Sequence, residues 1–236
     1  MTRSRSIGVA LASIILGSGL LAAAGFALAS AEPSSKAATC EPPAVMGQCH
    51  ITISAYPDSL AGMHGANGGA HPDWVSYANR NIILPANSLI TMTINNYDGG
   101  ASPNNDYFRK VVGTIGNTAS FNGGAPSSYW SQDMGHTFTM RGIPDNQPNL
   151  FISVPLPANP DVDTCAAAAI GSLPQCAAQG MGNYPKSPST VTFTFRTKGK
   201  GVYQWNCEYP CGGSREGQFG YAMSTFGYMS GTVTVE

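Results

Sequence analysis

The chain has 236 residues and a net charge of -1 at pH 7, and only 11% of its residues are charged, well below the roughly 25% of an average globular domain. This balance gives no basic surface for nucleic acid. With 28 glycines and 17 prolines, the composition favours many strands and turns over long salt-bridged helices.

The first 31 residues have the pattern of an export segment. Arg3 and Arg5 precede an uncharged apolar run over residues 7–28, and Ala29-Ser30-Ala31 forms an A-x-A-like cleavage site. An uncleaved anchor is the alternative, because the run approaches the roughly 20 residues that span a bilayer. We therefore expect a signal peptide or N-terminal membrane anchor over 1–31, and a secreted or extracytoplasmic location for the rest.

The six cysteines fall into three local pairs, which in an exported chain first suggest disulfides. The pairs are Cys40 with Cys49, Cys165 with Cys176, and Cys207 with Cys211. The first two pairs flank irregular segments and are predicted to be disulfides. For the third pair, a disulfide and a metal site both stay open.

After a tether and disulfide loop over 32–49, residues 50–236 are predicted to form one domain. Short runs in which apolar and polar residues alternate predict strands, and the intervening segments predict turns and long loops. The predicted strands cover 50–56, 81–84, 88–96, 133–140, 149–154, 190–196, 202–205 and 231–235, with a weaker one at 111–115. One short helix is predicted around Ala166–Ala169. This pattern predicts an all-β, antiparallel β-sandwich with long loop insertions.

A strand running into a loop with two thiols occupies residues 201–212. A histidine at the start of another strand and a methionine before the last strand complete a set of imidazole, thiolate and thioether donors, the ligand types of copper sites. The predicted ligands are His136, Cys207, Cys211 and Met229, with Met223, His64 and His71 as weaker candidates. The last two sit in a Gly-rich loop, where solvated histidines are the simpler interpretation.

Three segments resemble the cupredoxin family. The run 136–139 resembles the segment that carries its first histidine ligand, and Gly201-x-Tyr203-x-x-x-Cys207 resembles its penultimate strand and cysteine ligand. The run 229–235 resembles its axial methionine and final strand. The resemblance, over roughly residues 50–236, implies a Greek-key β-sandwich, bound copper and one-electron transfer.

Within that family, Cys207-x-x-x-Cys211-Gly212 is similar to the paired-thiolate loop of cytochrome c oxidase subunit II, which holds the dinuclear copper A centre. A single-copper blue site needs only one cysteine in this loop. The resemblance therefore implies that both thiols are ligands.

The chain departs from these patterns because no histidine follows His136. Phe226 occupies the place where the copper A pattern has its second histidine, and Tyr209 stands where that pattern has a glutamate between the thiols. Three outcomes stay open: a modified site from the four predicted ligands, a site completed by His64 or His71, or a sandwich without copper.

Two classes of function follow. The first is an exported copper-binding electron carrier with a redox partner such as a membrane oxidase or reductase. The second is a metal-free secreted binding or scaffold module with three disulfides, and a copper store or chaperone lies between them. The chain has no phosphate-cradling Gly loop, no G-x-S-x-G elbow and no H-E-x-x-H motif. We therefore predict a carrier and not an enzyme.

Overall fold

The computed structural model describes residues 37–41, 46–57, 74–142, 150–160, 188–211 and 220–236. The predicted export segment over 1–31 and the first residues of the tether, 32–36, lie outside this set. So do the predicted helix at Ala166–Ala169 and the Cys165/Cys176 pair. None of the helices in the described part of the chain has the length and hydropathy of a membrane-spanning segment.

One five-stranded sheet has the order β2-β1-β4-β8-β5. Its strands are β1 (Gln48–Tyr56), β2 (Ser76–Tyr77), β4 (Leu89–Asn96), β5 (Ala119–Phe121) and β8 (Ser189–Arg196). In β4 every second side chain is buried, from Ile90 to Asn96, because alternate residues of a strand face opposite sides of the sheet. β1 and β4 run parallel, with Cys49 opposite Ile90.

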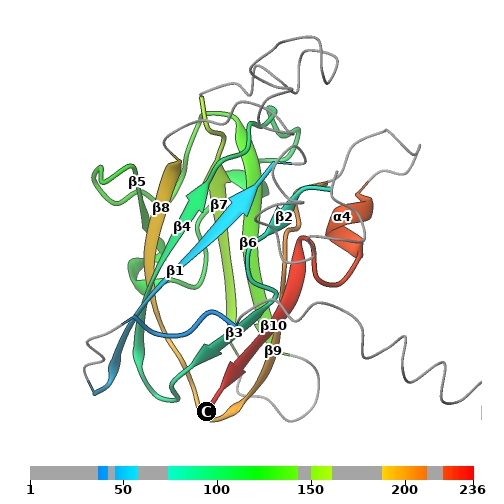
Figure 1. Cartoon of the computed structure of the whole chain (residues 1–236). Coiled ribbons are helices and arrows are strands. Elements are labelled where there is room, and N and C mark those ends of the chain that lie inside the picture. Colours follow the sequence, from blue (N-terminus) through cyan, green and yellow to red (C-terminus); the bar gives the residue numbers. More distant parts are fainter. Residues whose placement is uncertain (1–36, 42–45, 58–73, 143–149, 161–187, 212–219) are drawn as a thin grey trace, which may run out of the picture. The chain divides into compact units, whose positions relative to one another are not determined.

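The second sheet has the order β3-β10-β9-β6-β7. Its strands are β3 (Asn81–Leu84), β6 (Met134–Gly142), β7 (Phe151–Pro157), β9 (Gly201–Asn206) and β10 (Ser230–Val235). β10 pairs antiparallel with β9 and parallel with β3. Figure 1 shows β10 beginning beside the short helix α4 (Tyr221–Ser224) and running to the C-terminus at the other end of the sheet.

Aromatic side chains fill the space between the two sheets. Phe138 of β6 lies 6.2 Å from Phe193 of β8 and 5.6 Å from Trp205 of β9, measured between ring centroids. Tyr77 of β2 meets Trp205 edge-on at 4.8 Å. Large aromatic rings carry much of the apolar area that stabilises such a core, so these buried rings hold the two sheets together.

The predicted all-β sandwich is confirmed. Each of the eight main predicted strands overlaps an observed strand and differs from it by at most three residues at either end. The two parallel pairs make both sheets mixed, which corrects the expectation of purely antiparallel pairing. In the weaker predicted strand at 111–115, Val112 makes only an isolated bridge to Ser153. Two short 3-10 helices, η1 (Asp106–Arg109) and η2 (Ile115–Asn117), lie in the same part of the chain.

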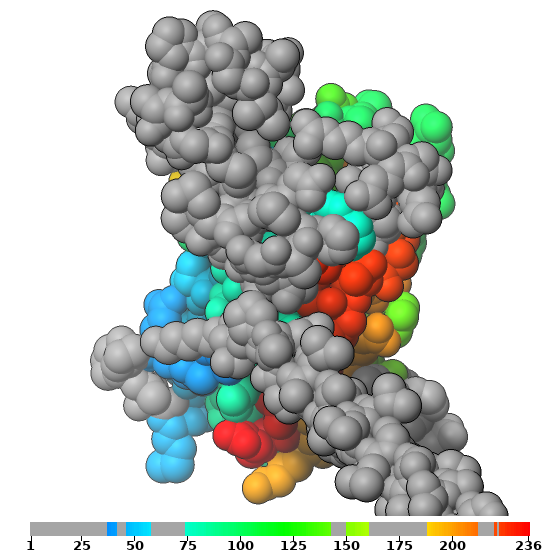
Figure 2. All heavy atoms as spheres, turned by 45° about the vertical axis from the view of Figure 1, so that its right-hand side comes forward, coloured from blue at the N-terminus to red at the C-terminus, as the bar shows by residue number. Residues whose placement is uncertain are grey.

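The segment before β10 packs against β2. The backbone N–H of Tyr77 donates to the carbonyl of Tyr228 at 2.9 Å, and the rings of Trp74 and Tyr228 lie 4.7 Å apart. Figure 2 shows the two segments side by side on the surface, turquoise against orange-red. This contact holds the residues around Met229 against the end of the sandwich where β4 ends and β6 begins.

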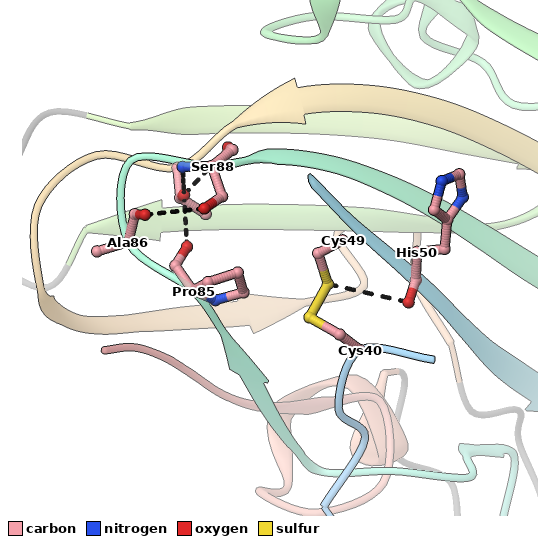
Figure 3. The surroundings of a disulfide bond; sticks show 7 residues. Cys40, Cys49, His50, Pro85, Ala86 and Ser88 are labelled. Carbon is pink, nitrogen blue, oxygen red and sulfur yellow. Dashed lines mark hydrogen bonds between the residues drawn. A yellow bond between two sulfur atoms is a disulfide. The ribbon is translucent and has the colours of Figure 1, made fainter. Parts of the chain in front are cut away.

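A disulfide joins Cys40 and Cys49, as the sequence predicts. It lies at the start of β1, beside the loop with Pro85, Ala86 and Ser88 (Figure 3). The C-terminal residue belongs to the same end, since the N–H of Ala86 donates to the carbonyl of Glu236 at 2.8 Å.

Candidate metal centre

His136 is the second residue after the start of β6. A register shift between Met134 and His136 interrupts the pairing of β6 with β7. The imidazole is 2% exposed, so its two nitrogens must find partners within the protein. Both nitrogens have one: Nδ1 faces a thiol and Nε2 faces a carboxylate.

Cys207 follows the last residue of β9, and Cys211 lies four positions further on. Both cysteines are free thiols and both are buried. One donor atom from each of His136, Cys207 and Cys211 falls within 4.8 Å of the others. The alternative of a third disulfide between the two cysteines is therefore wrong for this structure, and with it the module with three disulfides.

The imidazole faces the two sulfurs. Nδ1 of His136 lies 3.0 Å from Sγ of Cys211 and 4.0 Å from Sγ of Cys207. With metal–sulfur bonds of about 2.3 Å and metal–nitrogen bonds of about 2.0 Å, two ligands of one ion stand roughly 3–4.6 Å apart. One nitrogen and two soft sulfurs at these separations fit a copper ion, which the three side chains would hold between them.

Backbone groups complete the surroundings of the sulfurs. The N–H of Thr137 points at Sγ of Cys207 at 3.4 Å. The carbonyl oxygen of Tyr209 lies 3.0 Å from Sγ of Cys207 and 2.9 Å from Sγ of Cys211. Tyr209, the residue that replaces the expected glutamate, thus contributes a backbone oxygen on the same side as both thiols.

The hydrogen bond from the other imidazole nitrogen goes to a carboxylate that the sequence analysis did not identify. Nε2 of His136 lies 2.9 Å from Oδ2 of Asp98, which follows β4 by two residues. The side chain of Asp98 is 29% exposed and that of His136 is 3% exposed. A metal-binding histidine commonly donates its second N–H to a carboxylate in this way.

These contacts shift the pKa values of His136 and Cys207 in the direction opposite to the shift that burial alone would cause. Burial lowers the pKa of His136, but the hydrogen bond to Asp98 and the contact with Cys207 outweigh it and raise the pKa to about 9. Burial raises the pKa of the Cys207 thiol, yet its contacts with Cys211 and His136 bring it down to about 5. Burial and the neighbouring Cys207 raise the pKa of Cys211 well above its ordinary value.

The two thiols therefore titrate as one pair. At neutral pH, the metal-free site holds an imidazolium, one thiolate and one thiol. The shorter nitrogen–sulfur distance is to Cys211 while the lowered pKa falls on Cys207, so the charge belongs to the pair. A thiolate that is already ionised is the form that binds a metal ion.

Both candidate methionines have their backbones at the site. The N–H of Cys207 donates to the carbonyl of Met229 at 2.7 Å, and the N–H of Met223 donates to the carbonyl of Cys211 at 3.2 Å. Met229 is fully buried, and Met223 is partly buried against the core. Ligation by either thioether stays a prediction.

Other predicted positions are distributed differently. His64 and His71 lie outside the described residues. His50, the other histidine in the part of the chain that the structure describes, is exposed on β1. Phe226, at the position of the missing second histidine, is 52% exposed.

Tyr77 is a second buried residue near the site that the sequence does not single out. The hydroxyl of Tyr77 donates to the carbonyl of Thr137 at 3.2 Å. Burial, followed by the charges of Cys207 and Cys211, raises the pKa of Tyr77 well above its ordinary value. Its strand has only two residues, too few to show a sequence pattern.

No protein-family model and no curated protein matches the chain. Among solved structures, it is similar to reduced rusticyanin (12% identity, 87% of each chain covered, TM-score 0.37). It is similar to rusticyanin from Thiobacillus ferrooxidans (11% identity, 87% of this chain and 88% of that chain, TM-score 0.35). A third similar structure is auracyanin B (16% identity, 86% of this chain and 99% of that chain, TM-score 0.30).

Proposed function

We propose that this chain is a copper-binding electron carrier of the cupredoxin type, and not a catalyst. The observation that supports the proposal is the meeting of His136 Nδ1 and two free, buried thiols within 4.8 Å of one another. These donors come from two places in the sequence, β6 and the loop after β9, and the fold brings them together. Thiolate and imidazole donors on a rigid sandwich are suited to copper that changes oxidation state with little movement of its ligands.

Copper titration of the reduced protein tests this function. Binding of cupric ion is expected to produce a visible thiolate-to-copper charge-transfer band, and Cys207→Ala is expected to abolish it. The matched control is the double variant Cys40→Ala/Cys49→Ala, which removes a sulfur pair at the other end of β1 and is expected to keep the band. A wild-type protein that stays colourless and does not retain copper contradicts the proposal.

A copper store or chaperone is the second candidate. It is favoured by the donor set itself, because two sulfurs and one imidazole form a soft site that suits cuprous ion, and Phe226 stands where the copper A pattern has a second histidine. Cyclic voltammetry of the loaded protein separates the two functions. A reversible one-electron couple supports the carrier, whereas tight cuprous binding without such a couple supports the store.

We also propose that the chain is exported and that its partner is a redox protein, such as a membrane oxidase or reductase. The disulfide between Cys40 and Cys49 supports an oxidising compartment, and the apolar N-terminal run supports export. N-terminal sequencing of the protein from its native cell tests this: an N-terminus at Glu32 supports cleavage and export, whereas an intact N-terminus in a cytosolic fraction contradicts export.

A further inference from the structure

Asp98 is held in place by the backbone of its own turn and by neighbouring strands. Its Oδ1 accepts from the N–H of Gly99 at 2.8 Å. Its backbone carbonyl accepts from the side-chain amide of Asn96 at 3.1 Å and from the N–H of Asn159 at 2.8 Å. Asn96 is fully buried and also donates to the carbonyl of Pro157 at 3.0 Å. The turn after β4 is thereby tied to the end of β7, and the orientation of the carboxylate is fixed.

The same turn also meets β6 directly. The N–H of Ala101 donates to the carbonyl of Met134 at 3.1 Å, and the N–H of Met134 donates back to Ala101 at 3.2 Å. Gly135 makes room for this contact, since a Cβ at that position would lie 2.5 Å from the carbonyl oxygen of Gly99. Backbone contacts therefore fix both the turn that carries Asp98 and the strand that carries His136, and so they fix the Asp98–His136 contact.

From this geometry we propose that Asp98 is the positioning residue for His136: its carboxylate accepts the Nε2–H and keeps the proton on that nitrogen, so that Nδ1, which faces the two sulfurs, is the nitrogen that loses its proton when a metal ion binds. The proposal rests on the proposed copper function and adds to it a residue outside the predicted ligand set. Fixing the tautomer matters because a metal ion needs an unprotonated nitrogen, and Nδ1 is the nitrogen that faces the thiols. The negative charge of Asp98 also makes the imidazole more basic, and therefore a stronger electron-pair donor to a metal ion.

The two effects of Asp98 can be separated by substitution. Asp98→Asn keeps an oxygen that can accept the Nε2–H but removes the charge, whereas Asp98→Ala removes both. The matched control is Glu208→Gln, which removes one carboxylate next to Cys207. The carboxylate of Glu208 is paired with Arg141 at 3.1 Å, whereas the imidazole of His136 is paired with Asp98. Far-UV circular dichroism and thermal unfolding of each metal-free variant check that it folds.

We expect cuprous affinity, measured by competition with a chromophoric chelator, to fall about 10–100-fold in Asp98→Ala. Asp98→Asn is expected to lose less affinity but to have a more positive reduction potential, because a nearby negative charge favours cupric over cuprous copper. Glu208→Gln is expected to keep the wild-type affinity and visible spectrum. Wild-type affinity and spectrum in Asp98→Ala overturn the proposal, and so does an equal loss in Glu208→Gln.

A second readout does not depend on affinity. In the cuprous protein, which is diamagnetic, 15N NMR of the histidine ring is expected to show a slowly exchanging Nε2–H in wild type and fast exchange in Asp98→Ala. An Nδ1–H in the wild-type protein loaded with cuprous copper overturns the proposal.

If the wild type takes up no copper, the proposed copper function fails, and the same comparison is made with Cd²⁺, which also prefers thiolates. Cadmium binding that weakens in Asp98→Ala still supports the role of Asp98. A wild type that binds neither ion overturns both proposals.

Discussion

Gly135 lies against the backbone carbonyl of Gly99, so closely that a Cβ on Gly135 would stand 2.5 Å from that oxygen. Real Cβ atoms essentially never come so near. The strand that carries His136 and the turn that carries Asp98 can therefore touch because residue 135 has no side chain. Gly100 of the turn meets the same requirement, since a Cβ there would lie 2.2 Å from the carbonyl oxygen of Met134. The backbone geometry of the candidate centre depends on these two glycines.

Gly135→Ala is expected to push the turn away from β6. We expect a loss of about 1–3 kcal/mol in the free energy of unfolding, and weaker copper binding because Asp98 moves away from Nε2 of His136. Gly99→Ala is the control, since a Cβ at Gly99 meets nothing within 4 Å. Urea denaturation and copper competition measure the two effects. Equal behaviour of the two variants would contradict the close-contact explanation.

The ionisation of the site predicts how the stability of the metal-free protein depends on pH. The pKa of Cys207 is about 5 when folded and near 8.5 when unfolded. Between these values the unfolded chain binds the extra proton, so this group adds stability as pH rises. The pKa of His136 is about 9 when folded and about 6.5 when unfolded, so its contribution is complete below pH ~6.5 and is lost as pH rises to 9.

Together these groups predict a rise in stability from about pH 5 to 6.5, on the order of 1–2 kcal/mol, and then a plateau on which the two contributions nearly cancel. Above pH ~9 stability is expected to fall, because the raised pKa of Cys211 keeps that thiol protonated in the folded state only. The measurement is urea denaturation without oxygen or metal, with Cys207→Ser/Cys211→Ser as the reference for the remaining ionisable groups. Parallel pH profiles for the two proteins would rule out the ionised pair.

The strands of the sandwich were predictable because a strand with one buried face has an apolar residue at every second position. In β4, apolar Ile90, Met92 and Ile94 alternate with polar neighbours, and they face the core as expected. The alternation says which face is buried but not which strand lies alongside, so the parallel pairing of β1 with β4 was missed.

Two short strands were also missed, for different reasons. β2 has only two residues, and a distant partner, Tyr228, accepts a hydrogen bond from its backbone. β5 had a local signal: it is followed by Asn122-Gly123, with φ of 49° and 72°, the residue pair that favours a tight hairpin turn. This signal could have located β5.

At the site, the residue types with a distinctive chemistry were predictable and their supports were not. His136, Cys207 and Cys211 could be singled out because imidazole and paired thiols are rare and carry their own chemistry. Asp98 is an ordinary carboxylate after a strand, 38 residues before its partner, and only the folded chain brings the two together. The same holds for Tyr77, whose contact with Thr137 spans 60 residues.

The thioether ligand can be identified by comparing two methionines. If Met229 ligates copper, Met229→Leu is expected to weaken copper binding about tenfold, which equals about 1.4 kcal/mol, and to change the visible spectrum. Met223→Leu is expected to leave both unchanged. Both substitutions nearly conserve volume, so each is expected to change the free energy of unfolding by less than about 1.5 kcal/mol. The reverse outcome would assign the thioether to Met223.

The disulfide and the candidate centre are expected to act independently. Cys49 lies opposite Ile90 at the start of β4, and Asp98 follows the end of that strand, so the two sites are about 20 Å apart along β4 at roughly 3.3 Å per residue. The sequence separation of Cys40 and Cys49 is 9, and a loop of this length gives about 2–3 kcal/mol of stabilisation by restricting the unfolded chain. Cys40→Ala/Cys49→Ala is therefore expected to lower the free energy of unfolding by that amount and to keep the copper affinity of wild type.

Urea denaturation and copper competition on the same samples check both parts. A loss of copper affinity in this variant, under conditions where it is folded, would show that the two ends of the sandwich are coupled.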